Sequence, residues 1–190
     1  MGGAPAIGVI SLPEPCLVVL VGAAGSGKST LAARLFDPEA ILSSDAHRAL
    51  VSGDETDQGV TRTAFSILHR RLERRLAERR TAVVDATSVT SFARRSLTRR
   101  AAAAGVPAIA IVLALDPTVV RARNATRSGR IVPEAVLDRQ LEDLERSRRR
   151  GLEADGFAAV HVLRTPGEVD ALAVATLGAI PRVSSPSPPR

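Results

Sequence analysis

A glycine-rich segment at 22–30 constrains this chain more than any other feature, because it contains the only lysine and follows a short apolar run at 17–21. Its sequence, GAAGSGKST, fits the pattern Gly-x-x-x-x-Gly-Lys-[Ser/Thr], in which a strand passes through a turn into a helix. Glycines there can adopt positive φ, so that successive backbone N–H groups point at one anion at the helix N-terminus. The segment therefore predicts a phosphate-binding loop.

The polar residues of this loop have separate expected roles in binding a nucleoside triphosphate. Lys28 carries a compact charge that can reach the β- and γ-phosphates. The Ser29 hydroxyl is placed to ligate Mg²⁺, which prefers oxygen ligands. The residues expected to hold the nucleotide are Gly22, Gly25, Ser26, Gly27, Lys28, Ser29 and Thr30.

Composition favours one globular domain but does not fix its partner. The chain has 190 residues, 45% hydrophobic and 24% charged, which is enough for one substantial core. The net charge of +6 mildly favours a polyanionic partner, although arginine-rich coding in a GC-rich genome would produce the same charge. Cys16 is the sole cysteine, and no apolar run approaches the roughly 20 residues of a membrane span. We expect a cytoplasmic protein with no membrane partner.

Apolar runs alternate with helical patterns along the chain. Five short runs indicate buried strands, at 17–21, 40–43, 81–85, 108–115 and 158–163. The clearest helix is expected at 61–80, where Phe65, Leu68, Leu72 and Leu76 recur at three- and four-residue spacing. Strands that alternate with helices favour a parallel sheet covered on both faces. The predicted fold is therefore α/β, with a five-stranded parallel sheet.

Composition at the two ends sets the expected domain boundaries. Residues 1–15 are rich in Gly, Pro and Ala and predict a flexible N-terminal lead. Residues 181–190 are rich in Pro and Ser and predict a disordered tail. The folded domain is expected over 16–180, with an arginine-rich lid at about 123–135.

Two aspartates follow predicted strands, at the edge where parallel sheets bind their ligands. Asp45 follows the second strand, and it shares a face with Arg48 if a helix starts at Asp45. Asp45 suits either a base that accepts the proton of an attacking hydroxyl or a helix N-cap. Asp85 ends the third strand and suits either an outer-shell Mg²⁺ ligand or a structural hydrogen-bond acceptor.

Arginines gather in a short segment after the fourth predicted strand. Arg121, Arg123, Arg127 and Arg130 lie there, and the pair at 128–129, Ser-Gly, gives the segment a flexible centre. Phosphoryl-transfer enzymes commonly bring arginine onto the transferring group from a closing segment. The pattern predicts such a lid; a solvated basic loop is the alternative.

Taken together, these motifs resemble the bacterial polynucleotide 5′-kinases, above all the kinase module of the bacterial RNA-repair polynucleotide kinase-phosphatase. The likeness spans roughly residues 17–170. Beyond the generic phosphate loop, it rests on SSDAHR at 43–48, DQGVT at 57–61, VVDAT at 83–87 and RNATRSGR at 123–130. The remaining chain is too short for a phosphatase, so no 3′-end healing is expected.

The resemblance implies an enzyme of the P-loop kinase superfamily that transfers the γ-phosphate of ATP, with Mg²⁺, to 5′-hydroxyl ends of DNA or RNA. It implies that Asp45 is the general base and that Lys28 holds the phosphates. It also implies that Arg48 contacts the acceptor strand and that Gln58 lies near the acceptor channel.

The same resemblance assigns roles to residues of the lid and beyond it. It implies that Arg130, helped by Arg123 and Arg127, clamps the phosphates. It implies that Val136 offers an apolar surface to the terminal base, and that the loop containing Pro166 passes the adenine.

Two other functions remain open at this point. A kinase of the same fold that phosphorylates a small-molecule hydroxyl (an antibiotic, sugar or nucleoside) would use the same aspartate and arginine. A nucleotide-dependent switch would hydrolyse ATP slowly and need no acceptor base. The sequence does not choose between DNA and RNA, and it leaves the oligomeric state open, including a homodimer.

Overall fold

The computed structural model describes residues 8–45, 58–127 and 131–177, with the backbone alone at 58–62 and 177. Its centre is a five-stranded parallel sheet in the order β3-β4-β2-β5-β6. These strands are β2 (Leu17–Val21), β3 (Ile41–Ser43), β4 (Ala82–Asp85), β5 (Ala108–Leu113) and β6 (Ala159–Leu163). Each lies within a predicted apolar run, so the predicted α/β fold with a five-stranded parallel sheet is confirmed.

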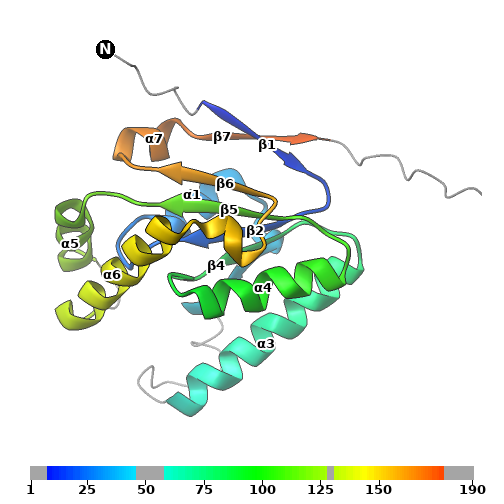
Figure 1. Cartoon of the computed structure of the whole chain (residues 1–190), viewed down its shortest axis with the longest axis horizontal. Helices are drawn as coiled ribbons and strands as arrows, with labels where there is room; N and C mark the ends of the chain where they lie inside the picture. Colours follow the sequence, from blue (N-terminus) through cyan, green and yellow to red (C-terminus); the bar gives the residue numbers. More distant parts are fainter. Residues whose placement is uncertain (1–7, 46–57, 128–130, 178–190) are drawn as a thin grey trace, which may run out of the picture.

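Helices cover both faces of this sheet (Figure 1). The helices and short 3-10 turns are α1 (Lys28–Leu35), η1 (Pro38–Ala40), α3 (Gln58–Ala77), α4 (Ser91–Ala103), α5 (Pro117–Ala125), α6 (Glu134–Arg150), η2 (Leu152–Asp155) and α7 (Pro166–Ala171). Side chains alternate across β2, so that Val18 and Leu20 join the core beneath α1, while Leu17 and Val19 join the core beneath α3 and α4. The sheet is therefore buried on both faces, as a parallel sheet requires.

The helix expected at 61–80 is α3, which begins three residues earlier and ends at Ala77. Leu68, Leu72 and Leu76 are 0–1% exposed and pack into the core with β2 and α4. Phe65 is half-buried. The three-and-four spacing thus identified the buried face of the helix correctly.

The N-terminal part of the chain differs from the expected flexible lead. Residues Val9–Pro13 form a strand, β1, which pairs in parallel with β7 (Ala173–Leu177) as a separate two-stranded sheet. Ile10 and Leu12 are buried, whereas Val9 is 65% exposed, so the strand shows the alternation of a half-buried edge. The glycines and prolines around this short alternation obscured it in the sequence. The expected tail at 181–190 lies outside the described residues.

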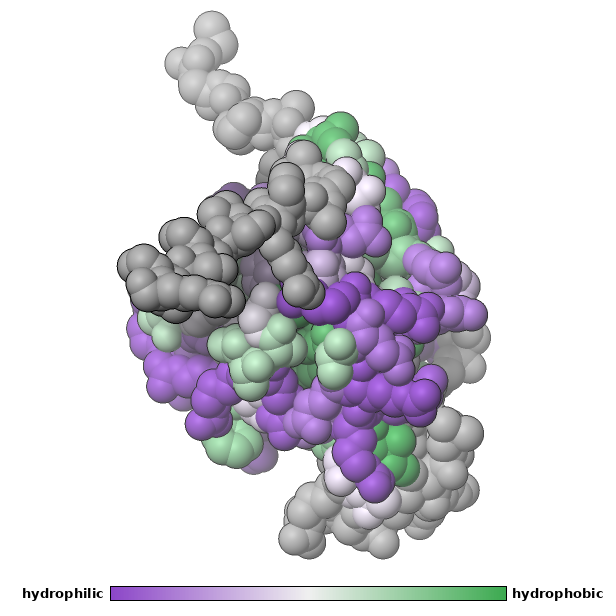
Figure 2. Space-filling model, turned by 90° about the vertical axis from the view of Figure 1, so that its right-hand side faces the viewer, coloured by the Kyte–Doolittle hydropathy of each residue, from purple (hydrophilic) through white to green (hydrophobic). Residues whose placement is uncertain are grey.

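Figure 2 shows the side of the molecule at which the C-terminal ends of α3 and α4 lie. Hydrophilic side chains cover most of the described surface on this side. Arg74 of α3 is exposed, and so are Arg79 and Arg80, which follow this helix. Among the described residues, no helix is both long enough and apolar enough to cross a membrane.

Candidate active site

The glycine-rich segment forms the turn between β2 and α1. Gly27 has a left-handed backbone conformation with φ of 97°, and α1 begins at Lys28 directly after it. Gly25 has φ of 82°, and a Cβ at this position would lie 2.8 Å from the Val120 carbonyl oxygen of α5. Only glycine fits where the loop passes α5 so closely. The loop residues Gly22 and Ser26 are buried, and Ser29 and Thr30 lie exposed in the first turn of α1.

The Lys28 ammonium group is held inside this loop. Lys28 is 7% exposed, and Nζ donates to the Ala23 carbonyl at 2.9 Å and to the Ser26 hydroxyl at 3.3 Å. Burial lowers the pKa of Lys28 to about 8; the charges of Asp85 and Asp45 oppose this shift and the charge of Arg127 adds to it. A buried cation whose charged form is disfavoured gains most from an incoming anion, and a phosphate supplies one.

Ser29 and Asp85 form the candidate Mg²⁺ site. The Ser29 hydroxyl donates to Asp85 Oδ2 at 2.7 Å, which joins the start of α1 to the end of β4. Asp85 is 6% exposed, and its charge acts on Lys28. A hydroxyl and a carboxylate are the hard oxygen donors that Mg²⁺ prefers, so the donor set fits this ion. Mg²⁺ usually keeps several waters and binds substrate phosphates beside one or two protein ligands, so these would complete its coordination. The described residues contain no group of three or more His, Cys, Asp or Glu side chains that could hold a metal.

Asp45 lies at the end of β3, next in the sheet to β4. Residues 44 and 45 are helical, so Asp45 lies inside a helical turn and not before it, unlike an N-cap. Asp45 is exposed, and it lies near enough to Lys28 for its charge to oppose the lowering of the Lys28 pKa. The structure thus brings Asp45, Asp85 and Lys28 to one edge of the sheet. Arg48 lies outside the described residues.

The predicted lid arginines divide between two places. Arg123 Nη1 lies 3.5 Å from the position that a Cβ on Gly27 would occupy, and the charge of Arg127 acts on Lys28. Arg121 instead forms ion pairs with Glu134 and Asp138 of α6 and does not belong to the phosphate-facing set. Arg130 lies outside the described residues.

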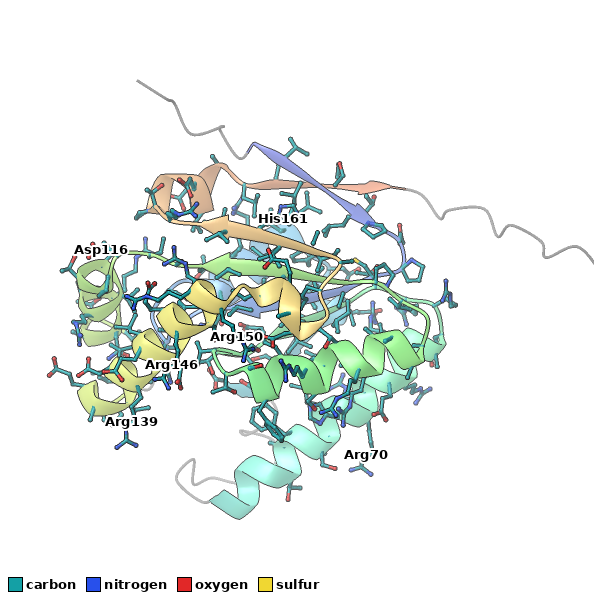
Figure 3. The ribbon with its side chains drawn as sticks, in the orientation of Figure 1. Arg70, Asp116, Arg139, Arg146, Arg150 and His161 are labelled. Atoms are coloured by element: carbon teal, nitrogen blue, oxygen red, sulfur yellow. The ribbon has the colours of Figure 1, made fainter. Side chains whose placement is uncertain are left out.

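Asn124 joins the end of α5 to the segment before α6, a role that sequence reasoning did not assign. Its side chain is buried, donates through Nδ2 to the Val132 carbonyl at 2.9 Å and accepts from the Val132 N–H at 3.1 Å. This pair of hydrogen bonds ties the end of α5 to the segment that leads into α6. Asp116, labelled in Figure 3, caps the other end of α5 by accepting from Thr118 N–H at 2.8 Å.

Gln140 of α6 also contacts the phosphate loop, a contact that sequence analysis did not predict. Its Oε1 accepts from the Ala24 N–H at 2.8 Å. Because 116 residues separate the two partners, no local pattern could have indicated this contact.

Three further predicted residues, Gln58, Val136 and Pro166, lie on the helices α3, α6 and α7. Gln58 is the first residue of α3, and its side chain is not described. Val136 lies in the first turn of α6 and is 42% exposed. The expected loop at Pro166 is instead the start of α7, because Thr165 caps this helix by accepting from Glu168 N–H at 3.1 Å and proline suits the first helical position. Helix α7 follows β6 and packs near α1, where Arg34 donates to the Val169 and Leu172 carbonyls.

A phosphate loop between a central strand and its helix, on a sheet in the order β3-β4-β2-β5-β6, defines a P-loop kinase-like fold. The chain belongs to the AAA domain family, whose model matches residues 17–147. A search of curated proteins found no match.

Solved structures share this fold. One is a chain of the Pnkp1/Rnl/Hen1 RNA repair complex, with a TM-score of 0.64 and 18% identity over 74% of this chain and 47% of that one. A gluconokinase from Sinorhizobium meliloti 1021 has a TM-score of 0.52 and 21% identity, covering 84% and 90%. A sugar kinase from Janibacter sp. HTCC2649 has a TM-score of 0.55 and 21% identity, covering 79% and 85%. The chain therefore spans about half of the matched RNA repair protein, and these likenesses show the fold alone.

Proposed function

We propose that the protein is a polynucleotide 5′-hydroxyl kinase, which transfers the γ-phosphate of ATP to the 5′-hydroxyl end of DNA or RNA. One observation carries this proposal: Asp45 and Asp85 lie at the ends of the neighbouring strands β3 and β4, where both charges act on the buried Lys28. Lys28, Ser29 and Asp85 account for a bound nucleotide with its metal. Asp45 is an additional, exposed carboxylate next to them, which suits a base for a second substrate.

The transfer would take place in one displacement. The Asp45 carboxylate accepts the proton of the 5′-hydroxyl, and the hydroxyl oxygen forms a bond to the γ-phosphorus. The bond between that phosphorus and the β–γ bridging oxygen breaks, and ADP leaves with the electron pair. Mg²⁺, held by Ser29 and Asp85, would neutralise charge on the phosphates. Lys28 and the arginines Arg123 and Arg127 would stabilise the same charge from the protein side.

Residues that the structure does not describe, or leaves at a distance, complete the proposal. Arg130 would clamp the phosphates together with Arg123 and Arg127, and Arg48 would contact the acceptor strand. Gln58 would line the acceptor channel from the start of α3, and Val136 would contact the terminal base. Pro166, at the start of α7, would lie against the adenine.

Two observations favour a nucleic acid as the acceptor. The net charge of +6 suits a polyanion. The fold is similar to a chain of an RNA repair complex, with a TM-score of 0.64.

The test is label transfer from γ-labelled ATP, with Mg²⁺, to single-stranded DNA and RNA. Strands with a 5′-hydroxyl are expected to take up label, and the same strands with a 5′-phosphate are not. The Asp45→Asn protein should lose about 10²- to 10⁴-fold in rate while it still binds ATP, because it lacks only the base. Asp170→Asn, which changes an exposed carboxylate on α7, is the matched control. ATP binding without label on any strand would contradict the proposal.

A small-molecule kinase is the second candidate, because the gluconokinase and sugar kinase match over 90% and 85% of their own chains. Salt dependence separates the two functions. Acceptor binding should weaken with a log–log slope of about −0.7 for each single-strand phosphate contacted, whereas a small neutral acceptor should show little change.

A further inference from the structure

A buried carboxylate outside the site described above binds three arginines. Asp155, at the end of η2, has a fully buried side chain. It accepts from Arg94 Nε at 2.8 Å, from Arg95 Nε at 3.1 Å and from Arg150 Nη2 at 2.7 Å. Arg94 is itself completely buried and donates further to backbone carbonyls of residues 88 and 89. The Arg94–Asp155 pair thus holds α4 and η2 together.

This cluster leaves positive charge at the surface. The cluster has three guanidinium groups and a single carboxylate, so Asp155 neutralises only one of the three positive charges. The buried Arg94 is paired with it through Nη2, which lies 2.7 Å from Asp155 Oδ2. Arg95 and Arg150 are about half exposed, at 52% and 49% of their side chains. Their charges therefore face solvent, where a polyanion can reach them.

A groove of about 680 Å³ lies over the cluster. Its lining includes Phe92, Arg95 and Arg99 of α4, together with Arg150 of α6. Phe92 is 81% exposed, whereas the other three phenylalanines of the chain are buried or half-buried. An exposed aromatic ring among guanidinium groups is the combination that binds single-stranded nucleic acids, since the ring stacks on a base and the arginines contact phosphates.

The groove lies within reach of the candidate active site. Helix α4 follows β4, and six residues lead from Asp85 to Ser91, which span at most about 20 Å. Figure 3 shows Arg139, Arg146 and Arg150 along α6, with Arg150 at the end of the helix that meets α4. Arg150 Nη2 donates to the Ser91 hydroxyl at 2.6 Å, which confirms that the two helices meet there.

We propose that this groove binds the acceptor strand several nucleotides from its 5′ end, with Phe92 stacked on a base and Arg95, Arg99 and Arg150 on phosphates. The inference rests on the proposed function and adds a second contact region for the same substrate. Bases stacked at about 3.4 Å place this region within about six nucleotides of the reacting hydroxyl.

The experiment measures phosphorylation of single strands of 2 to 12 nucleotides that share one 5′ sequence. For strands longer than about six nucleotides, Phe92→Ala should raise KM by at least about fivefold, because the base stacked on the ring loses its contact, and should leave kcat unchanged. The dinucleotide should be phosphorylated equally by both proteins, and Phe92→Tyr should restore the wild-type KM. Arg99→Glu should also raise KM for long strands, and Arg70→Glu on α3, an exposed arginine outside the groove, is the matched control.

Each outcome decides between this inference and the proposed function. An active kinase whose length dependence is the same with and without Phe92 would overturn the groove and leave the kinase standing. If the protein phosphorylates none of the strands, its binding to the longest strand is measured by fluorescence anisotropy without ATP. Binding that is weakened by Phe92→Ala would then support the groove although the kinase proposal had failed, and binding unaffected by it would overturn both. A poly-glutamate peptide that binds as well as the strand would also overturn the groove, because charge alone would then account for binding.

Discussion

The Gln140 carboxamide oxygen accepts a hydrogen bond from the Ala24 backbone N–H at 2.8 Å, and so joins α6 to the phosphate loop. Helix α6 follows the segment that Asn124 ties to the end of α5. The phosphate loop is therefore in direct contact with the helix to which this segment leads.

Replacing Gln140 by leucine, which keeps most of the side-chain volume, should weaken ATP binding by about two- to tenfold. The reason is that one hydrogen bond that orders the loop, with a net value of about 0.5–1.5 kcal/mol, is lost. Calorimetric titration of ATP with Mg²⁺ measures the effect. Arg139→Ala, an exposed neighbour on the same helix, serves as the control and should bind ATP normally. Unchanged affinity in Gln140→Leu would show that the contact only packs α6.

Replacing Lys28 by methionine should abolish nucleotide binding and make the free protein more stable. Burial lowers the pKa of Lys28 from 10.5 to about 8, so the unfolded chain binds this proton more tightly than the folded one. Near neutral pH, this difference in pKa lowers the free energy of unfolding by an amount on the order of 3 kcal/mol. Lys28→Met removes the buried charge and therefore this loss of stability.

The same shift predicts how stability depends on pH. Between pH 8 and about 10.5 the unfolded state holds more of this proton, so the free energy of unfolding should rise with pH through that window. Urea denaturation at pH 7.5 and 10 measures this rise in the free energy of unfolding, in the wild-type protein and in Lys28→Met. An equal increment in both proteins would mean that Lys28 does not cause it.

Replacing Asp85 by asparagine should raise the Mg²⁺ concentration needed for half-maximal activity by about 10- to 100-fold, because the carboxylate holds the Ser29 hydroxyl and supplies charge beside the metal. Affinity for ATP without Mg²⁺ should fall little. A Mg²⁺ titration of ATP turnover, with or without an acceptor strand, gives both quantities. An unaltered Mg²⁺ requirement would assign Asp85 a purely structural role.

Replacing Asp155 by alanine should destabilise the fold by about 3–5 kcal/mol, because it leaves the buried Arg94 without its counter-charge. Arg95→Ala removes a half-exposed partner of the same carboxylate and should cost about 1 kcal/mol or less. Urea denaturation compares the two variants. Similar losses in both would indicate that the cluster acts as one unit and not through the buried pair.

The sequence predicted those parts of the fold that have a local pattern. Glycine spacing predicted the phosphate loop, apolar runs predicted the five central strands, and helical periodicity predicted the buried leucines of α3. Each of these patterns lies within a short stretch of sequence. Strand β1 was missed because only Ile10 and Leu12 alternate there, between glycines and prolines. Pairing with β7, at the other end of the described chain, makes it a strand.

The candidate site shows the same division. Lys28 and Ser29 carry a motif, and Asp85 could be placed at a strand end, although the sequence left its role open. The contacts of Gln140 with Ala24 and of Asp155 with Arg94 join distant segments, and the residue types involved are common on solvated helices. Such pairs become visible only once the sheet order and the helix packing are known.

The pairing of β1 with β7 also bears on the order in which the chain can assemble. Among the described elements, β1 is synthesised before all the others and its partner, residues 173–177, after all the others. The backbone of β1 therefore has no partner strand until all five strands of the central sheet have been synthesised, and its pairing with β7 closes a long loop. A nascent chain halted before residue 173 would leave β1 as an unpaired strand edge, which chaperones can bind.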